Sequence, residues 1–332
     1  MASTPPTTEL ARSPSEPAGS PAAVSEASFG SADERDARPA APSPAAEPRD
    51  PLEDTPYRSL RLIGAGGMGQ VLLAAERRAG RQVAVKLIRR RFGQIPDLVA
   101  RFHEEARAAS QTGHPHIVEV LDFGQTSDGR PFMVMELLDG ESLHDLLRRE
   151  GPIAQEKAIE IAIQMCDALG AAHVRGVIHR DLKPANVFLV RQPSGRPFVK
   201  LLDFGLAKLI GHDEIPEVPT KVYGTPEYMA PEMARPARPP EATADIYSLG
   251  ILLYEMLTGK VPFYSDDPQA IVEAHVKTMP VPPSELVPEE AIAADLEAIV
   301  LIALRKRPER RYQSMEEMSR SLWRVQRRLR PR

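Results

Sequence analysis

The stretch LIGAGGMGQVLLAAE, from Leu62 to Glu76, contains glycines in the spacing G-x-G-x-x-G, at Gly64, Gly66 and Gly69. This spacing occurs in two unrelated kinds of nucleotide site. In one, the glycines open a helix and hold the pyrophosphate of a dinucleotide; in the other, they form a hairpin over the phosphates of ATP. A glycine turn that binds no ligand is the third alternative, so the flanking sequence has to decide.

The residues after the glycines favour the hairpin. A dinucleotide site needs a helix directly after the turn and an acidic residue roughly 20 positions further on. Residues 70–75 are instead apolar and prone to β structure, and the stretch RQVAVKLI at 81–88 offers Lys86 and no acid. A phosphate loop of the other common type is excluded, because no G-K-[ST] follows the glycines. We therefore predict a mobile hairpin lid at 64–69, followed by a strand that carries Lys86.

Apolar spacing extends this reading along the chain. Alternating or clustered apolar residues predict strands at 57–64, 69–76 and 81–89, and two more within 116–138 around the turn at Asp128 and Gly129. Helical spacing marks 97–112, 142–149 and 154–176. A mostly β first part and a mostly α second part predict an α+β fold of two lobes with a cleft between them.

The segment before this pattern differs in composition. Residues 1–54 are rich in Pro, Ala, Ser and Glu, and such a segment buries too little apolar surface to offset the entropy of ordering it. We expect a disordered tail there. The predicted folded domain spans 55–328, divided into a small lobe at 55–138 and a helical lobe at 139–328.

Composition bounds the partners and the compartment. The net charge of −4 and the pI near 6.1 give no sign of a nucleic-acid binder. Basic runs at 89–91 and 324–332 are interpreted as solvated charge, with a membrane-surface or acidic-partner patch as the secondary reading. The single cysteine, Cys166, excludes a disulfide within the chain and fits a cytoplasmic protein. No apolar run is long enough to span a bilayer, which takes about 20 residues.

Further motifs follow in order: HRDLKPAN at 179–186, DFG at 203–205 and GTPEYMAPE at 224–232. A second LDFG, at 121–124, precedes HRDLKPAN, so it stands in the wrong order to be equivalent to the motif at 203–205. Together with the glycines and the VAVK strand, these motifs resemble those of the eukaryotic-like (Hanks-type) serine/threonine protein kinases, bacterial branch, over residues 57–325. The resemblance implies the bilobal protein-kinase fold, with a β-rich small lobe and a larger helical lobe.

The resemblance also implies roles in phosphoryl transfer. Asp181 matches the residue that orients the substrate hydroxyl and accepts its proton, and Lys183 matches the one that contacts the γ-phosphate. Lys86 should hold the α- and β-phosphates and pair with Glu105, or failing that with Glu104. Asn186 and Asp203 match the ligands of Mg²⁺, with Mn²⁺ as an alternative ion.

The nucleotide site implied by the resemblance combines the lid, the strand and the segment between the lobes. Met135 resembles the residue that gates the back of this site. The expected ATP-binding residues are Ile63, Gly64, Ala65, Gly66, Gly67, Met68, Gly69, Val71, Ala84, Lys86, Glu136, Leu138 and Phe188.

The segment from Asp203 to Glu232 matches an activation loop. Thr220 is the first candidate for phosphorylation and Thr225 the second, although Thr225 is more simply expected to hydrogen-bond Asp181 and Lys183. Arg180 would pair with a phosphate on this loop.

Two structural contacts are also implied. Glu232 should pair with Arg311, and Asp245 should hold the catalytic loop through its backbone amides. The expected partners are protein substrates and a second copy of the chain, for dimerisation or autophosphorylation. A scaffold that binds without transfer, or a kinase of small molecules, would be the competing function.

Overall fold

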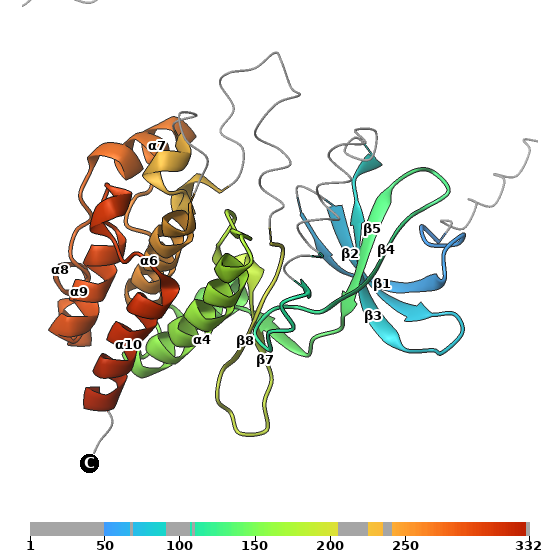
Figure 1. Ribbon diagram of the computed structural model, residues 1–332, viewed down its shortest axis with the longest axis horizontal. Coiled ribbons are helices and arrows are strands. Elements are labelled where there is room, and N and C mark those ends of the chain that lie inside the picture. Colours follow the sequence, from blue (N-terminus) through green and yellow to red (C-terminus); the bar gives the residue numbers. More distant parts are fainter. Residues whose placement is uncertain are drawn as a thin grey trace, which may run out of the picture. The chain divides into compact units, whose positions relative to one another are not determined.

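The computed structural model describes residues 50–66, 69–90, 107, 110–204, 225–234 and 241–329. In this part of the chain a five-stranded antiparallel sheet comes first and helices dominate from residue 143 onward (Figure 1). The sheet strands are β1 (Tyr57–Ala65), β2 (Gly69–Glu76), β3 (Gln82–Ile88), β4 (Val120–Gln125) and β5 (Pro131–Glu136). A second, three-stranded sheet contains β6 (Gly140–Ser142), β7 (Val187–Val190) and β8 (Phe198–Leu201).

The α-helices are α3 (Leu143–Glu150), α4 (Gln155–Val174), α6 (Ala242–Thr258), α7 (Pro268–Lys277), α8 (Pro283–Leu286), α9 (Ala294–Ala303) and α10 (Met315–Leu329). The 3-10 turns are η1 (Pro184–Asn186), η2 (Pro226–Tyr228), η3 (Pro231–Ala234), η4 (Pro288–Glu290) and η5 (Pro308–Arg310). This order confirms the predicted α+β fold. The helix predicted at 97–112 lies almost entirely outside the described residues.

The first sheet has the order β1-β2-β3-β5-β4, and a hydrophobic cluster covers each of its faces. Alternation along the strands produces the two clusters, since successive side chains point to opposite faces. One cluster contains Leu72, Val85 and Phe132, and the other contains Ala84, Met133 and Met135.

Residues 50–54, which the sequence assigned to the tail, pack against this sheet. Leu52 is completely buried in the same cluster as Phe132. Arg77 fastens the segment, because its guanidinium donates hydrogen bonds to the backbone carbonyls of Leu52, Glu53 and Thr55 at 3.0–3.3 Å.

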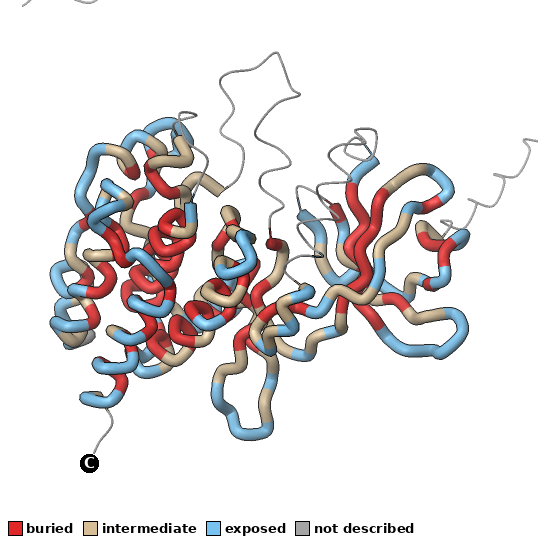
Figure 2. Tube along the Cα trace, viewed as in Figure 1, coloured by how far each residue is buried: buried red, intermediate tan, exposed pale blue. Residues whose placement is uncertain are grey.

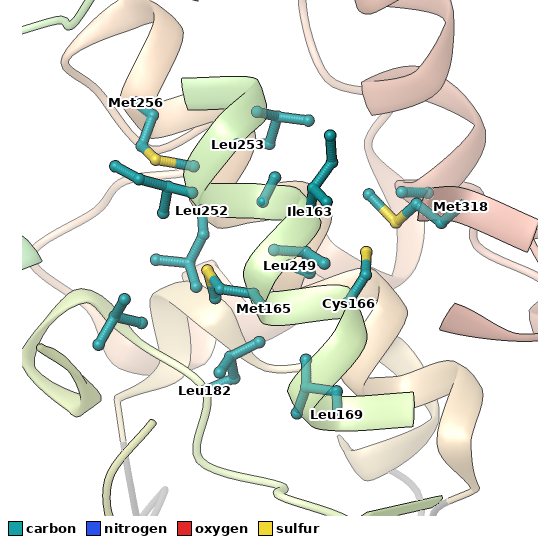
Figure 3. Packing of buried hydrophobic residues seen from close by; sticks show 14 of the residues in the cluster. Ile163, Met165, Cys166, Leu169, Leu182, Leu249, Leu252, Leu253, Met256 and Met318 are labelled. Atoms are coloured by element: carbon teal, nitrogen blue, oxygen red, sulfur yellow. The ribbon is translucent and has the colours of Figure 1, made fainter. Parts of the chain in front are cut away.

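The helical part is built around α4 and α6. Nearly every residue of α6 is buried, which is the pattern of a helix surrounded by protein. Figure 3 shows Cys166 of α4 among buried side chains that include Leu249 of α6 and Met318 of α10. The strongest burial in this part of the chain follows these helices (Figure 2). This core provides a rigid support for the loops that follow α4 and precede α6.

Candidate active site

The glycine stretch forms a strand–turn–strand hairpin, as predicted. β1 ends at Ala65, β2 begins at Gly69, and the backbone N–H of Gly66 donates to the carbonyl of Gly69 at 2.9 Å. Gly67 and Met68, at the tip, lie outside the described residues.

The glycines differ in the space around them. A Cβ added at Gly69 would lie 2.2 Å from the backbone oxygen of Leu87 on the neighbouring strand, so packing alone requires glycine there. A Cβ added at Gly66 would meet nothing within 4 Å, and one at Gly64 would make only ordinary contacts with Val71. The backbone at Gly64 and Gly66 is therefore open to a ligand.

Lys86 lies in the middle of β3 and is 7% exposed. Its ammonium nitrogen is 2.6 Å from Oδ2 of Asp203, which follows β8. The sequence predicted a carboxylate partner for this buried lysine but placed it at Glu105 or Glu104, and both lie outside the described residues. Among the described residues, Asp203 is the carboxylate that pairs with Lys86.

Residues of the predicted catalytic loop converge on the Asp181 carboxylate. The ammonium of Lys183 donates to its Oδ2 at 2.7 Å. The side-chain amide nitrogen of Asn186 donates to the same oxygen at 3.2 Å and to the backbone carbonyl of Asp181 at 2.8 Å. These bonds fix the direction of the carboxylate and leave the amide oxygen of Asn186 available as an acceptor.

Asp245, at the start of α6, anchors this loop as the sequence predicted. Its carboxylate accepts the backbone N–H groups of His179 and Arg180, both at 2.9 Å. His173 Nε2 also lies 2.7 Å from Oδ2. Burial alone raises the pKa of Asp245, but the hydrogen bond from His173 and the charges of His173 and His179 lower it on balance. Asp245 thus stays ionised while it holds the loop.

Two non-glycine residues of this region have left-handed backbones: Arg180 at φ 64° and Asp203 at φ 57°. Such conformations are costly and persist only where surrounding contacts enforce them. Asp245 holds the backbone of Arg180. Next to Asp203, the ring of Phe204 is 3% exposed, and its centre lies 4.6 Å from that of the His179 ring. The sequence indicated neither conformation.

The apolar residues expected around adenine are only partly brought together. Ala84 and Met135 belong to one buried cluster, against which Val71 and Leu138 pack. Ile63, on β1, is 39% exposed. Phe188, on β7, is half-buried and lies outside that cluster.

The side chain of Glu136, where β5 ends, makes contacts that the sequence did not reveal. Its Oε1 accepts the ammonium of Lys200 at 2.6 Å and the backbone N–H of Glu119 at 2.9 Å. Lys200 lies on β8, three residues before Asp203. The connection between the two sheets is therefore tied to the strand that leads to Asp203.

Thr225 and Glu232 lie in the described part of the predicted activation segment, whereas Thr220 does not. Among the described residues, no hydrogen bond joins Thr225 to Asp181 or Lys183, so that pairing stays a prediction. The carbonyl of Thr225 accepts the N–H of Tyr228, because Thr225 caps η2. The predicted pairing of Glu232 with Arg311 is confirmed as a two-pronged ion pair at 2.7 and 2.8 Å.

The donor set suits a magnesium ion that is shared with a phosphate ligand. Asp203 and Asn186 offer hard oxygen atoms, and Mg²⁺ in proteins usually takes only one or two protein carboxylates plus waters and substrate phosphates. Among the described residues, no three His, Cys, Asp or Glu side chains form a metal cluster.

Comparison with known proteins identifies the class. Residues 57–323 match the protein kinase domain family, and the chain belongs to this family. The serine/threonine-protein kinase Pkn1 of Myxococcus xanthus is 43% identical over 277 residues, which cover 82% of this chain and 39% of that protein. PknB of Mycobacterium leprae is 43% identical over 267 residues, 80% of this chain and 42% of PknB. The chain thus spans about two fifths of the length of these relatives.

Solved kinase structures share the fold. The crystal structure of the Mycobacterium tuberculosis PknI kinase domain aligns with a TM-score of 0.63 and 26% identity, covering 82% of this chain and 96% of that chain. The crystal structure of Rad53 residues 1–466 in complex with AMP-PNP aligns with a TM-score of 0.67 and 25% identity, covering 81% of this chain and 66% of that one. The protein-kinase fold predicted from the motifs is confirmed.

Proposed function

We propose that the chain is a serine/threonine protein kinase that transfers the γ-phosphoryl group of ATP to hydroxyl groups of protein substrates. The observation that carries the proposal is the hydrogen-bonded group of Asp181, Lys183 and Asn186, held in place by the buried Asp245. Phosphoryl transfer asks a protein mainly for positioning and charge stabilisation, and this group provides both. The names of the relatives Pkn1 and PknB support the same activity.

The proposed roles follow from the geometry around Asp181. Its carboxylate would orient the attacking hydroxyl and take its proton, while Lys183, 2.7 Å away, would stabilise charge on the transferred group. Lys86 would move from Asp203 to the α- and β-phosphates when the nucleotide binds, with Glu105 as its proposed partner. A lysine that is 7% exposed cannot stay unpaired in either state.

ATP would lie under the glycine hairpin. The open backbone at Gly64 and Gly66 suits close approach of phosphate oxygens, and the cluster of Val71, Ala84 and Leu138 suits the adenine ring. The similar solved structure of Rad53 residues 1–466 is a complex with AMP-PNP, which supports a nucleotide as the ligand. The other proposed contacts are Ile63, Ala65, Gly67, Met68, Gly69, Lys86, Glu136 and Phe188.

Asn186 and Asp203 would hold Mg²⁺, or Mn²⁺ as the alternative. When bound, the ion would neutralise part of the charge of the phosphates. The chain contributes the orientation of both ligands: Asn186 through its bonds to Asp181, and Asp203 through its left-handed backbone.

We further propose regulation by phosphorylation of the activation segment in a signalling pathway. Thr220 is the first proposed phosphosite and Thr225 the second, with a second copy of the chain as the phosphorylating partner. Asp245 holds the backbone N–H groups of His179 and Arg180, and Asp181 comes next in the chain. A phosphate bound to the Arg180 side chain would therefore act directly on the position of Asp181.

The test is phosphorylation by the purified chain with labelled ATP and Mg²⁺, with phosphoamino-acid analysis of the product. We expect label on serine or threonine. The label should disappear in Asp181→Asn and in Lys86→Ala, and persist in Lys277→Ala, which removes an exposed lysine paired with Glu273. Undiminished label in both site variants would refute the assigned roles, and label confined to tyrosine would refute the substrate class.

A further inference from the structure

The exposed side of the last helix, α10, combines arginines with a tryptophan. α10 buries Met318, Leu322 and Val325, and its other side carries Arg320, Trp323, Arg324 and Arg327, which we call the arginine face. At 3.6 residues per turn these four side chains fall within about 100° of the helix circumference. They form one stripe and are not scattered around the helix.

The charges of this stripe are not neutralised within the described residues. No carboxylate there forms an ion pair with Arg320, Arg324 or Arg327, whereas the neighbouring Arg328 pairs with Asp295. Glu316 and Glu317 occupy the first turn, so positive charge is concentrated toward the end of the helix. The chain as a whole carries a net charge of −4, which makes this local excess of cations stand out.

Trp323 adds an apolar ring to the same stripe. It is 44% exposed, although burial of an indole is strongly favourable. Arginine side chains are attracted to anionic headgroups, and the amphipathic indole ring of a tryptophan favours the headgroup level of a membrane surface.

The opposite side of α10 keeps the helix in place. Met318, shown beside Cys166 in Figure 3, belongs to the core of the helical part, and α10 packs along α4. The helix therefore cannot roll or insert deeply, and only its outer stripe can touch a surface. No helix among the described residues could cross a membrane. Peripheral contact is the mode that this geometry allows.

We propose that the arginine face docks on an anionic lipid surface, with α10 parallel to it. The contact would be reversible and sensitive to salt, because headgroup attraction is screened within about 10 Å at moderate ionic strength. Each cation near such a surface multiplies partitioning roughly fivefold, so three arginines acting together would raise it about a hundredfold. This docking is independent of the proposed catalytic roles.

Trp323 permits a direct test, because it is the only tryptophan of the chain. The full chain is titrated with vesicles of equal parts phosphatidylcholine and phosphatidylglycerol, and with phosphatidylcholine vesicles alone. We expect a blue shift of the tryptophan emission and co-sedimentation with the anionic vesicles only, both reversed by high salt. Sedimentation without any change in emission would show that another surface binds, and would refute the proposal.

Charge-reversal variants of the arginine face provide a second test of the proposal. Arg320→Glu/Arg324→Glu/Arg327→Glu should lower vesicle partitioning roughly a hundredfold. The matched control is Arg58→Glu/Arg78→Glu/Arg81→Glu, which makes the same change in net charge at exposed arginines of β1 and of the turn between β2 and β3, and should retain most of the binding. Equal loss in both triple variants would refute docking through α10. Binding to polyglutamate but not to vesicles would also refute it, and would assign the face to an acidic protein.

Discussion

At the scale of single residues, the two glycines of the hairpin should respond differently to the same substitution. Gly69→Ala forces a methyl group against the carbonyl of Leu87, 2.2 Å away, and should destabilise the fold by about 1–3 kcal/mol. Gly66→Ala meets no protein atom within 4 Å and should change stability by less than about 0.5 kcal/mol. Urea unfolding of the two variants provides the comparison.

The same pair separates packing from ligand binding. If phosphates approach the backbone at Gly66, its alanine variant should raise the KM for ATP about tenfold, which corresponds to ~1.4 kcal/mol of lost binding. A stable Gly66→Ala variant with unchanged KM would contradict the proposed position of the phosphates.

At the scale of elements, the ion pair between Glu232 and Arg311 joins η3 to the loop before α10. The Arg311 guanidinium also donates to the backbone carbonyls of Thr243, Arg305 and Lys306. Arg311→Met would leave these carbonyls and a carboxylate unpaired, so unfolding free energy should fall by about 3–5 kcal/mol. Arg310→Met, next to it and exposed, should stay within about 0.5 kcal/mol. Similar losses in both would argue against a specific role of the pair.

The contact between α6 and α7 predicts a dependence of stability on pH. His275 of α7 is 1% exposed and its Nδ1 lies 2.9 Å from the hydroxyl of Tyr247 on α6. Burial, and next the charge of Lys306, lower the pKa of His275 from 6.5 to about 4. The unfolded chain thus takes up this proton at a higher pH than the folded chain does. Stability should fall as pH drops from about 6.5 to about 4, by roughly 3 kcal/mol in total.

This dependence can be isolated by measuring unfolding free energy against pH. His275→Gln should flatten the slope between these two values by up to one proton, whatever its effect on absolute stability. His144→Gln, at an exposed position of α3, should keep the full slope. An unchanged slope in His275→Gln would show that other groups cause the acid sensitivity.

At the scale of the whole molecule, we propose that the folded domain begins near Asp50. Leu52 is fully buried against the first sheet, and Leu52→Ala should cost about 2–4 kcal/mol. Leu60→Ala, at a leucine that is 42% exposed, is the matched control and should cost less than about 0.5 kcal/mol. A chain that starts at Tyr57 should unfold more readily than one that starts at Asp50. Equal stability of these two chains would contradict the proposed boundary.

Much of this molecule could be predicted from its sequence, because its strands, its helices and the matched motifs have local signals. The hairpin was predicted from its residue pattern, whereas the pairing of Glu232 with Arg311 and the anchoring by Asp245 were predicted from the resemblance to protein kinases. Contacts between distant segments that no motif encodes were not predicted. Leu52 sits alone in a proline-rich stretch without periodicity, and the pairing of Glu136 with Lys200 joins two ordinary surface-type residues.

The bond between Glu136 and Lys200 has a mechanical consequence. Lys200 also donates to the carbonyl of Ile117, and the backbone N–H of Val118 donates to the carbonyl of Leu201. The chain entering β4 and the chain leaving β5 are therefore both hydrogen-bonded to β8. Any displacement of the ends of β4 and β5 relative to β8 would therefore have to break these hydrogen bonds. Asp203 comes three residues after Lys200, so the place of this carboxylate depends on the strand that these bonds hold.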